Sequence, residues 1–454
     1  MTSLDPTVVV IGAGAAGLAA AHALRRRADR EGLPLELRVF EASPRAGGHL
    51  GTVREDGFAI ETGPNGFLSG EPAADGLVDE LGLAPSLLEA RPASHRRFLV
   101  RNGRLRRLPA NPLGLFTTRA LSFRGRLRLA LEPWIPNRPP LEEESVAEFG
   151  RRRFGREAAD LLADAVVAGT SAGSAATLSM AAAYPALVEM ERRHGSVVRG
   201  MIARRRAGVP APRLRSLAGG MGALAEALAA RLGPALSLDD PVVSVTREGE
   251  GWRVERRRGD ALYARRVILA IPAAQAARML AGCGPVLATA LAAIPSAGLA
   301  AIGLAWRARD LPHPLDGYGC LVPAREGLRT LGMVWESCLF PGRAPEGAVL
   351  VRMMLGGARS PETAGLAEAE LLALARDEAG LVLGIRQRPE RAWVFRWPAA
   401  IPQYTRGHRE RVTTIRREAA ALGGLELCGS SYDGISLTAA LASGIAAAER
   451  IGPA

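Results

Sequence analysis

Lysine is absent from the 454 residues of this chain. All 58 basic side chains are arginines, and with 46 acidic residues they give a net charge of +12. The absence excludes mechanisms that need a lysine amine, such as Schiff-base catalysis, a lysine in a phosphate-binding loop or a lysine general base. We attribute most of the arginine excess to codon bias and expect no nucleic-acid partner. Arginine still suits a carboxylate ligand, because its planar guanidinium can form two hydrogen bonds to it.

Cysteine and histidine are scarce. There are six histidines, without an H-x-x-x-H pair, and four cysteines without a C-x-x-C pair: Cys283, Cys320, Cys338 and Cys428. This pattern predicts neither a metal site nor a disulfide framework, and it favours a reducing, cytoplasmic location. The opening MTSLDPTVVVIG lacks the basic start and apolar run of a secretion signal, so no cleaved signal is expected.

Uninterrupted apolar runs are missing too. Residues 165–188 and 279–306 carry no charge and are long enough to cross a membrane, but Pro185 interrupts the first, and Pro285 and Pro295 interrupt the second. A spanning helix needs about 20 predominantly apolar residues without such breaks. We therefore interpret both stretches as buried core or pocket lining. The chain as a whole is 48% hydrophobic, enough for a large core, and its length allows two or three domains.

The amino end carries a nucleotide-binding pattern. Residues 7–11 are a β-branched run typical of a buried parallel strand, residues 35–40 predict a second strand that ends at Glu41, and a glycine-rich turn and helix lie between them. The first glycine permits a tight turn, the second lets the backbone approach a pyrophosphate, and the third lets the helix pack closely on the sheet. The helix start favours phosphates, and Glu41 is placed to accept hydrogen bonds from ribose hydroxyls. The expected contacts in this turn are Gly12, Gly14, Ala15, Ala16 and Gly17.

Two more glycine-rich segments follow, at residues 41–48 and 57–65. A second close approach of the backbone to the ligand is useful when the ligand extends beyond its pyrophosphate. The segments resemble the FAD-binding start of the amine oxidase-like flavoproteins, so FAD is the expected cofactor. They add Ala42, Arg45, Gly47, Gly48, Gly63, Pro64 and Asn65 to the expected contacts.

The carboxyl end completes the predicted site. Residues 425–429 predict a strand that ends in glycine, and residues 435–451 predict a helix whose start would again face the cofactor. In the middle of the chain, residues 240–245 and 266–271 predict strands of the same domain. These segments add Val242, Ala270, Gly429, Gly434, Ile435 and Ser436 to the expected cofactor contacts.

The sequence therefore predicts an α/β fold. Its FAD-binding, Rossmann-like domain, of the glutathione reductase and amine oxidase type, is expected from residues 1–60, 214–282 and 410–454. Residues 61–90 and 283–409 are expected to form an α+β substrate-binding domain, and residues 91–213 a mostly helical domain. In the helical part, arginines alternate with apolar residues. Two interpretations stay open for it, a membrane-associating surface and an ordinary solvated lobe.

Several segments together resemble the protoporphyrinogen oxidase family, flavoenzymes late in haem synthesis. The most specific are RRFL at 96–99 with LPANP at 108–112, and IPQYTRGH at 401–408. Others are GTSAG at 169–173, GYGCLVP at 317–323 and MLGG at 354–357. The resemblance extends over nearly the whole chain, from about residue 7 to residue 451.

The resemblance implies a six-electron oxidation of protoporphyrinogen IX to protoporphyrin IX. FAD would accept two electrons at a time, and dioxygen or a respiratory acceptor would reoxidise it, with three hydrogen peroxide formed when dioxygen is used. A hydride would pass from a meso carbon to flavin N5, so no side chain is needed as a catalytic base. A peripheral position on the inner membrane and a homodimer are compatible with the resemblance.

The resemblance also implies the substrate contacts. Arg97 would pair with a propionate, and Leu321 and Met354 would hold the macrocycle between them. The carbonyl group of Gly169 would face the ring edge, and Tyr318 stands where the family often has an aromatic residue. Departures from the family pattern occur next to the cofactor, at His49–Thr52 and Ile435–Thr438. His49 and His408 are expected to be structural rather than proton carriers.

Three alternatives remain. A coproporphyrinogen III oxidase would perform the same chemistry on a substrate with four propionates. An amine oxidase is disfavoured, because those enzymes commonly hold a lysine–water pair at flavin N5, although Trp397 and Tyr432 could form an aromatic cage. A carrier that binds a porphyrin without redox chemistry would lack a flavin spectrum.

Overall fold

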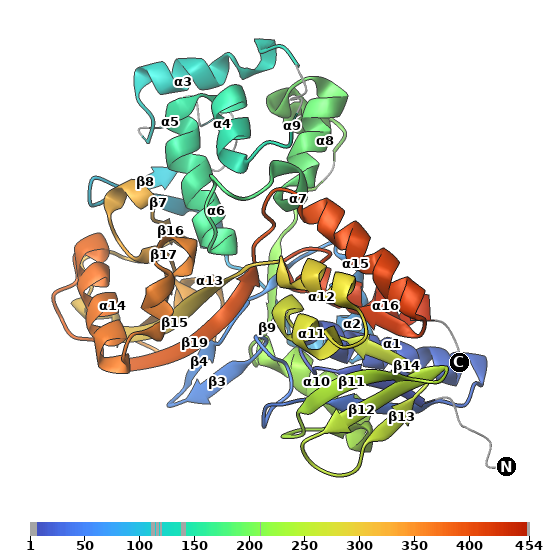
Figure 1. Cartoon of the computed structure of the whole chain (residues 1–454). Helices are drawn as coiled ribbons and strands as arrows, with labels where there is room; N and C mark the ends of the chain where they lie inside the picture. Colours follow the sequence, from blue (N-terminus) through green and yellow to red (C-terminus); the bar gives the residue numbers. More distant parts are fainter. Residues whose placement is uncertain are drawn as a thin grey trace.

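The computed structural model describes residues 7–109, 114, 118, 120–137, 142–208 and 210–451. The LPANP segment falls mostly outside these ranges. Figure 1 shows a helical lobe at the top, a long curved sheet at the left, and a sheet flanked by helices at the lower right.

A five-stranded parallel sheet forms the lower right part of Figure 1. Its order is β10-β2-β1-β14-β20, and its strands are β1 (Thr7–Ile11), β2 (Glu36–Phe40), β10 (Leu236–Ser237), β14 (Arg266–Leu269) and β20 (Leu425–Leu427). The side chains of β1 alternate between two cores: Val8 and Val10 contribute to one, Val9 and Ile11 to the other. A β-branched run buried on both faces is what a central parallel strand requires.

Helices cover one face of this sheet. They are α1 (Ala15–Glu31), α2 (Pro72–Glu80), α10 (Gly222–Leu232) and α16 (Leu437–Ile451). Ala74, Leu77 and Val78 of α2 share a core with β1 and α1. Residues 61–90 were expected in the substrate-binding domain. Helix α2, within this range, packs instead with the helices of the parallel sheet, because its apolar side contacts α16.

The other face carries a second layer. It contains a three-stranded antiparallel sheet of β11 (Val242–Glu248), β12 (Gly251–Arg256) and β13 (Leu262–Ala264). Three helices complete it: α11 (Ala273–Leu280), α12 (Pro285–Ala292) and α15 (His408–Leu422). The two strands predicted in the middle of the chain are both present. Residues 266–271 supply β14 of the parallel sheet, and residues 240–245 supply β11 of this separate sheet.

A seven-stranded sheet forms the left part of Figure 1. Its order is β19-β15-β18-β17-β16-β7-β8, and only β16 and β7 pair in parallel. The strands are β7 (Arg97–Arg101), β8 (Arg104–Leu108), β15 (Ser296–Arg307), β16 (Gly319–Leu321), β17 (Thr330–Val334), β18 (Ala348–Gly356) and β19 (Arg391–Pro402). Helix α14 (Glu368–Leu383) packs on one face, and α6 (Asp164–Ser171) packs on the other. The expected helical segment 91–213 therefore also supplies two strands, β7 and β8.

Short strands connect these parts. The hairpin β3 (Thr52–Glu55) and β4 (Phe58–Glu61) and the small sheet β5 (Phe67–Leu68), β9 (Leu214–Leu217) and β6 (Leu87–Glu89) lie at the junction. A short helix, α13 (Glu336–Leu339), follows β17.

The helical lobe projects from the seven-stranded sheet (Figure 1). It contains α3 (Phe123–Ala130), α4 (Val146–Phe154), α5 (Arg156–Ala158), α7 (Met180–Ala183), α8 (Pro185–His194) and α9 (Val197–Arg206). Among the described residues, no helix is long and apolar enough to cross a membrane. The uncharged stretch 165–188 forms most of α6, all of α7 and the start of α8, and the stretch 279–306 forms the end of α11, α12 and most of β15.

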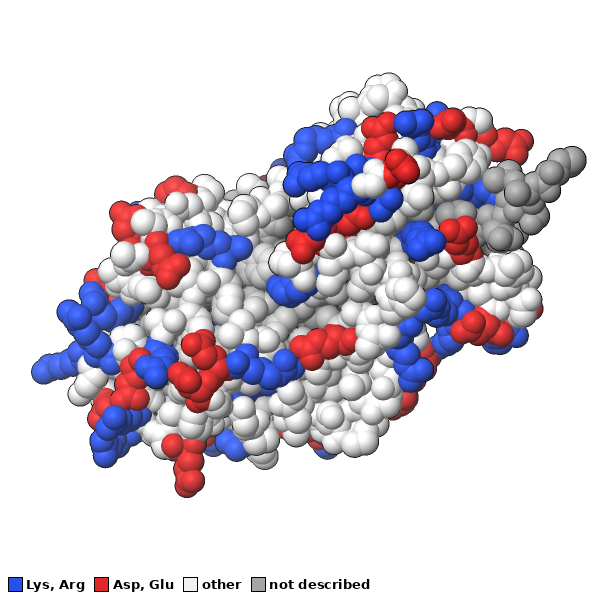
Figure 2. Space-filling model, turned by 90° about the horizontal axis from the view of Figure 1, so that it is seen from below, with Lys and Arg blue, Asp and Glu red and all other residues white. Residues whose placement is uncertain are grey.

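Charge is not concentrated on the face shown in Figure 2. Arginine and acidic side chains are interspersed along its edges, and an uncharged band runs between them.

Candidate functional site

The carboxyl ends of the parallel strands meet at one edge of the sheet, where ligands bind in open α/β sheets. Gly12 follows β1, Glu41 follows β2, Ala270 follows β14, and Gly429 comes two residues after β20. The backbone N–H of Ala270 donates to Ile11 O over 2.8 Å. Five expected cofactor contacts from distant parts of the chain are thus brought to this edge with α1: Gly12, Ala15, Ala16, Ala270 and Gly429.

The three glycines of the first turn differ in what surrounds them. A Cβ on Gly17 would lie 1.8 Å from Gly12 O, and a Cβ on Gly12 would lie 2.7 Å from Ala270 O at a φ of +96°. A Cβ on Gly14 would meet no atom of the described residues within 4 Å. Gly12 and Gly17 are therefore required by the packing of α1 on the sheet, whereas Gly14 borders open space at the start of a helix. The space beside Gly14 fits the pyrophosphate of FAD, since backbone N–H groups and the helix dipole favour an anion there.

Glu41 holds the glycine-rich turn. One carboxylate oxygen accepts from the N–H of Ala13 over 2.7 Å, and the other accepts from the N–H and Oγ of Ser43 over 2.9 and 2.8 Å. The oxygen that accepts from Ala13 has room for a further donor, so the expected ribose contact fits. Ala42 is exposed beside it. Segment 239–240 runs alongside, since Asp240 N donates to Glu41 O over 2.9 Å, and this places the start of β11, with the buried Val242, near the same strand end.

The second glycine pair lies against the first turn. Gly47 N donates to Ala13 O over 2.7 Å, and a Cβ on Gly48 would lie 3.3 Å from Gly14 Cα. Arg45 fixes this loop, because its Nη2 donates to Gly48 O over 2.8 Å. The third glycine-rich segment packs behind it, where a Cβ on Gly63 would lie 2.2 Å from His49 O. Gly63, Pro64 and the buried Asn65 thus continue from the loop toward the seven-stranded sheet.

The carboxyl-terminal loop, residues 429–436, closes onto α1. A Cβ on Gly429 would lie 3.7 Å from Ala16 Cβ, and a Cβ on Gly444 of α16 would lie 2.0 Å from Ala16 O. Ser436 caps α16, with its Oγ accepting from Ala439 N over 3.1 Å, and Ile435 beside it is half-buried. The predicted helix is therefore confirmed, beginning at Leu437 rather than Ile435.

Tyr404 ties this loop to the end of β19. Its hydroxyl donates to Ser430 O over 2.6 Å and accepts from Gly434 N over 2.7 Å. The tyrosine ring stacks on the His408 ring at 3.8 Å. Neither ring nitrogen of His408 has a hydrogen-bond partner among the described residues, and burial, with the nearby Arg411, lowers its pKa to about 4. A buried neutral imidazole fits the expected structural role.

Arg97 stands at the rim of the seven-stranded sheet. Its side chain is exposed, with Cζ 5.3 Å from the centre of the Tyr318 ring, and no acidic group pairs with it among the described residues. Burial raises the pKa of Tyr318, the Glu336 carboxylate raises it further, and the neighbouring Asn65 side chain opposes both. The buried Asn65 Nδ2 has no hydrogen-bond partner among the described residues. The expected substrate residues Arg97 and Tyr318 thus adjoin the expected cofactor residue Asn65.

The apolar substrate residues form a second group. A Cβ on Gly169 would lie 2.3 Å from Leu321 Cδ2, so α6 lies directly over β16. A Cβ on Gly332 would have Leu321 Cδ2 at 3.7 Å and Met354 Cε at 3.8 Å. Gly169, Leu321 and Met354 are therefore neighbours, although they come from one helix and two strands. Arg97 and Leu321 belong to adjacent paired strands, β7 and β16.

Two residues join the third glycine-rich segment, at Thr62 and Gly63, to the seven-stranded sheet, and the sequence did not predict this role for either of them. Arg352 pairs with Glu336 over 2.8 Å and donates from Nη1 to Gly63 O. Trp397 donates from Nε1 to Thr62 O over 2.8 Å and contacts the His49 ring edge-on at 4.5 Å. An arginine within the apolar strand 349–355 was the available signal for the first, and the sequence marked Trp397 only as a possible residue of an aromatic cage.

The aromatic cage considered for an amine substrate is not formed. Tyr432 is buried in the core under the parallel sheet, and Trp397 packs with Met354 under α6. In the described part of the chain there is also no group of three metal-binding side chains.

Residues 15–452 match the family of flavin containing amine oxidoreductases. The protoporphyrinogen oxidase of Homo sapiens is 33% identical over 472 residues, which cover 97% of each chain. The coproporphyrinogen III oxidase of Bacillus subtilis is 29% identical over 457 residues, covering 97% of this chain and 96% of its own. A crystal structure from Exiguobacterium, provisionally designated a protoporphyrinogen oxidase, superposes with a TM-score of 0.86 at 25% identity, covering 99% of both chains.

Proposed function

Because the chain belongs to the flavin containing amine oxidoreductase family and FAD is its cofactor, we propose that it oxidises protoporphyrinogen IX to protoporphyrin IX with dioxygen as the electron acceptor. The oxidation removes six electrons and six protons from the substrate, and three dioxygen molecules become three hydrogen peroxide. The observation that carries the proposal is Arg97, an exposed guanidinium that has no acidic partner among the described residues and lies beside an apolar group of residues.

FAD, when bound, supplies the redox chemistry. The turn at Gly14, the Glu41 carboxylate and the loop 429–436 would hold it along the edge of the parallel sheet. Arg352 and Trp397 attach the third glycine-rich segment, at Gly63 and Thr62, to the sheet that carries the substrate residues. They would fix the distance between FAD and the porphyrinogen.

The residues assigned to the substrate have separate roles. The Arg97 guanidinium would bind a propionate through two charge-assisted hydrogen bonds. Leu321 and Met354 would contact the faces of the macrocycle, and the carbonyl group of Gly169 would face its edge. The absence of a side chain on Gly169 lets Leu321 pack against α6. These contacts orient the substrate and exclude water, which is the contribution expected of a protein whose cofactor performs the chemistry.

A coproporphyrinogen III oxidase is the second candidate, favoured by the Bacillus subtilis relative of that name. Its substrate has propionates in place of the two vinyl groups. Both substrates have the same macrocycle and would make the same contact with Arg97. The protein residues around the two substituents that differ, vinyl or propionate, would therefore decide which substrate is preferred.

A paired assay tests the proposal. Purified holoprotein is given protoporphyrinogen IX or coproporphyrinogen III in air, and porphyrin fluorescence and hydrogen peroxide are measured. Faster turnover of protoporphyrinogen IX, with three peroxide per porphyrin, supports the proposal. Preference for coproporphyrinogen III supports the second candidate, and a flavin-containing protein inactive on both overturns the substrate assignment.

Arg97→Ala tests the anchor. We expect KM for the porphyrinogen to rise at least tenfold, because a charged hydrogen-bonded pair contributes about 1.5–3 kcal/mol. Flavin content should stay unchanged. Arg107→Ala, on the neighbouring strand β8, is the matched control. An unchanged KM for Arg97→Ala would remove Arg97 from the site.

A further inference from the structure

One arginine side chain, that of Arg359, joins three elements of the candidate substrate site. Arg359 ends the short turn η9 (Gly357–Arg359), which follows β18. Its Nη2 donates to Asp164 Oδ2, at the start of α6, over 2.7 Å, and its Nη1 donates to Val322 O, just after β16, over 2.7 Å. The elements joined in this way, α6, β16 and β18, carry the three expected apolar substrate residues: Gly169, Leu321 and Met354.

The charges of this contact are largely withdrawn from water. The side chain of Arg359 is 12% exposed and that of Asp164 is 20% exposed. Burial lowers the pKa of Arg359, and the Asp164 carboxylate opposes that change. Asp164 Oδ2 also accepts from the N–H of Ala324 over 2.9 Å, so the same carboxylate holds the segment that follows β16. Such a pair is directional, and the loss of one member leaves a charge without its counter-charge.

The same turn also fixes the other end of α6. Ala172 follows the last residue of the helix in the left-handed conformation, with a φ of +51°. Its carbonyl oxygen accepts from Ala358 N over 2.7 Å, and a Cβ on Gly357 would lie 2.4 Å from that oxygen. The absence of a side chain on Gly357 therefore lets the turn approach the helix. Turn η9 thus holds α6 at its first residue and at the residue just after its last.

This attachment determines where Gly169, in the last turn of α6, lies. The helix packs on β16 and β17 (Figure 1), and its contact with Leu321 leaves no space for a side chain on Gly169. Apolar packing is not directional, so it does not by itself fix the helix along or around its axis. Hydrogen bonds at both ends do so. A misplacement of about 1 Å in a substrate site can lower the rate about a hundredfold.

We propose that Arg359 and Asp164 are positioning residues that set the spacing of α6, β16 and β18 around the porphyrinogen macrocycle. They act through Gly169, Leu321 and Met354 and do not themselves bind the substrate. The inference rests on the proposed function, because it concerns how the site for that substrate keeps its shape.

Steady-state kinetics of the holoprotein test the proposal. Arg359→Gln removes the guanidinium, and Asp164→Asn removes the counter-charge but keeps an oxygen that accepts hydrogen bonds. For both we expect kcat/KM for the preferred porphyrinogen, expressed per bound flavin and measured well below the unfolding temperature, to fall at least about tenfold. Flavin content should stay unchanged. Arg359→Lys keeps the charge opposite Asp164 without the planar fork, so its kcat/KM should lie between those of Arg359→Gln and the wild type.

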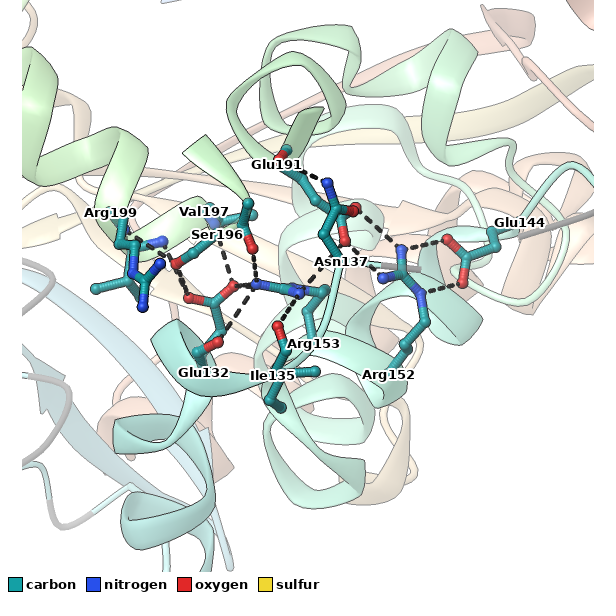
Figure 3. A network of polar contacts seen from close by, with 12 residues as sticks. Glu132, Ile135, Asn137, Glu144, Arg152, Arg153, Glu191, Ser196, Val197 and Arg199 are labelled. Carbon is teal, nitrogen blue, oxygen red and sulfur yellow. Dashed lines mark hydrogen bonds and ion pairs between the residues drawn. The ribbon is translucent and has the colours of Figure 1, made fainter. Parts of the chain in front are cut away.

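Arg152→Gln is the matched control (Figure 3). Arg152 lies in α4 of the helical lobe, its side chain is 24% exposed, and it pairs with Glu144 over 2.7 Å and with Glu191 over 2.6 Å. Its loss should lower the unfolding free energy, since it also leaves carboxylates without a counter-charge. Its kcat/KM per bound flavin should stay within about twofold of the wild-type value. A purely structural role of Arg359 would give the same result as this control.

The positioning role is therefore wrong if folded Arg359→Gln and Asp164→Asn proteins have the kcat/KM of Arg152→Gln, or if Arg359→Lys is as impaired as Arg359→Gln. Should Arg359→Gln not fold, Asp164→Asn decides. A wild type that oxidises neither protoporphyrinogen IX nor coproporphyrinogen III overturns the proposed function and this role with it. An active wild type with unimpaired variants overturns the positioning role alone.

Discussion

Gly14 is a position where an added Cβ would meet no atom of the described residues within 4 Å. Its φ of −72° suits any residue, and the space around its Cβ is open. We expect Gly14→Val to purify without flavin because the valine occupies the place of the pyrophosphate. The apoprotein should lose less than about 1 kcal/mol of unfolding free energy. The measurements are the flavin absorbance of the purified variant and its denaturant unfolding curve.

Gly76→Val is the control for this experiment, since a Cβ on Gly76 of α2 also meets no atom within 4 Å in the described part of the chain. That variant should retain flavin. A yellow Gly14→Val protein would contradict the placement of the pyrophosphate.

His408 makes stability depend on pH. Its pKa is about 4 in the folded protein, against an ordinary value of 6.5, so the unfolded chain takes up a proton that the folded chain does not. Stability is therefore lost as the pH falls from 6.5 to 4, by about 3 kcal/mol from this group alone. His408→Phe keeps a ring against Tyr404 and removes the titration. Urea unfolding at several pH values should give a shallower pH dependence for the variant, and equal slopes would contradict the assignment.

At the scale of elements, the loop 429–436 depends on one hydroxyl. Tyr404→Phe leaves Ser430 O and Gly434 N without their partner. Unpaired groups of this kind cost about 1–3 kcal/mol each. We expect a weaker affinity for FAD, measured by flavin release on dilution, together with a lower unfolding free energy.

The same loop supplies the control. The hydroxyl of Tyr432 is buried and has no partner in the described part of the chain. Tyr432→Phe should therefore leave flavin affinity unchanged and stability equal or higher. Identical flavin affinities for the two variants would show that Tyr404 does not position the loop.

At the scale of the whole molecule, buried charges join the cofactor side to the substrate side. Glu61 of β4 pairs with Arg343 over 3.0 Å, and it accepts from Thr52 Oγ1 over 2.7 Å and Met221 N over 3.0 Å. Burial raises the pKa of Glu61 and the Arg343 guanidinium opposes that rise. Three distant segments thus meet at one carboxylate.

Glu61→Gln should lower the unfolding free energy by about 3–5 kcal/mol, because it leaves a buried guanidinium without its counter-charge. Glu226→Gln is the control, since Glu226 is 61% exposed and pairs with Arg54 at the surface. That variant should change stability by less than about 1 kcal/mol. A similar small change for Glu61→Gln would mean that the buried pair does not hold the two sides together.

The sequence alone determined the nucleotide-binding unit. Strand β1, helix α1 and strand β2 appear where residues 7–41 predict them, and β14, β20 and α16 were also predicted from their own residues. These elements follow from β-branched runs, glycine positions and caps, which act between neighbours in the chain. The family resemblance predicted the same fold, because it also rests on short motifs of neighbouring residues.

Only the tertiary structure decided how the remaining segments meet. The contact of Gly169, Leu321 and Met354 requires α6 to lie over β16, and the packing of α2 beside α16 moves residues 72–80 to the cofactor side. The attachment of Gly63 by Arg352, of Gly434 by Tyr404 and of Glu61 by Arg343 joins residues far apart in sequence. Such contacts depend on burial and on the fit between whole elements, and no local pattern of residues encodes them.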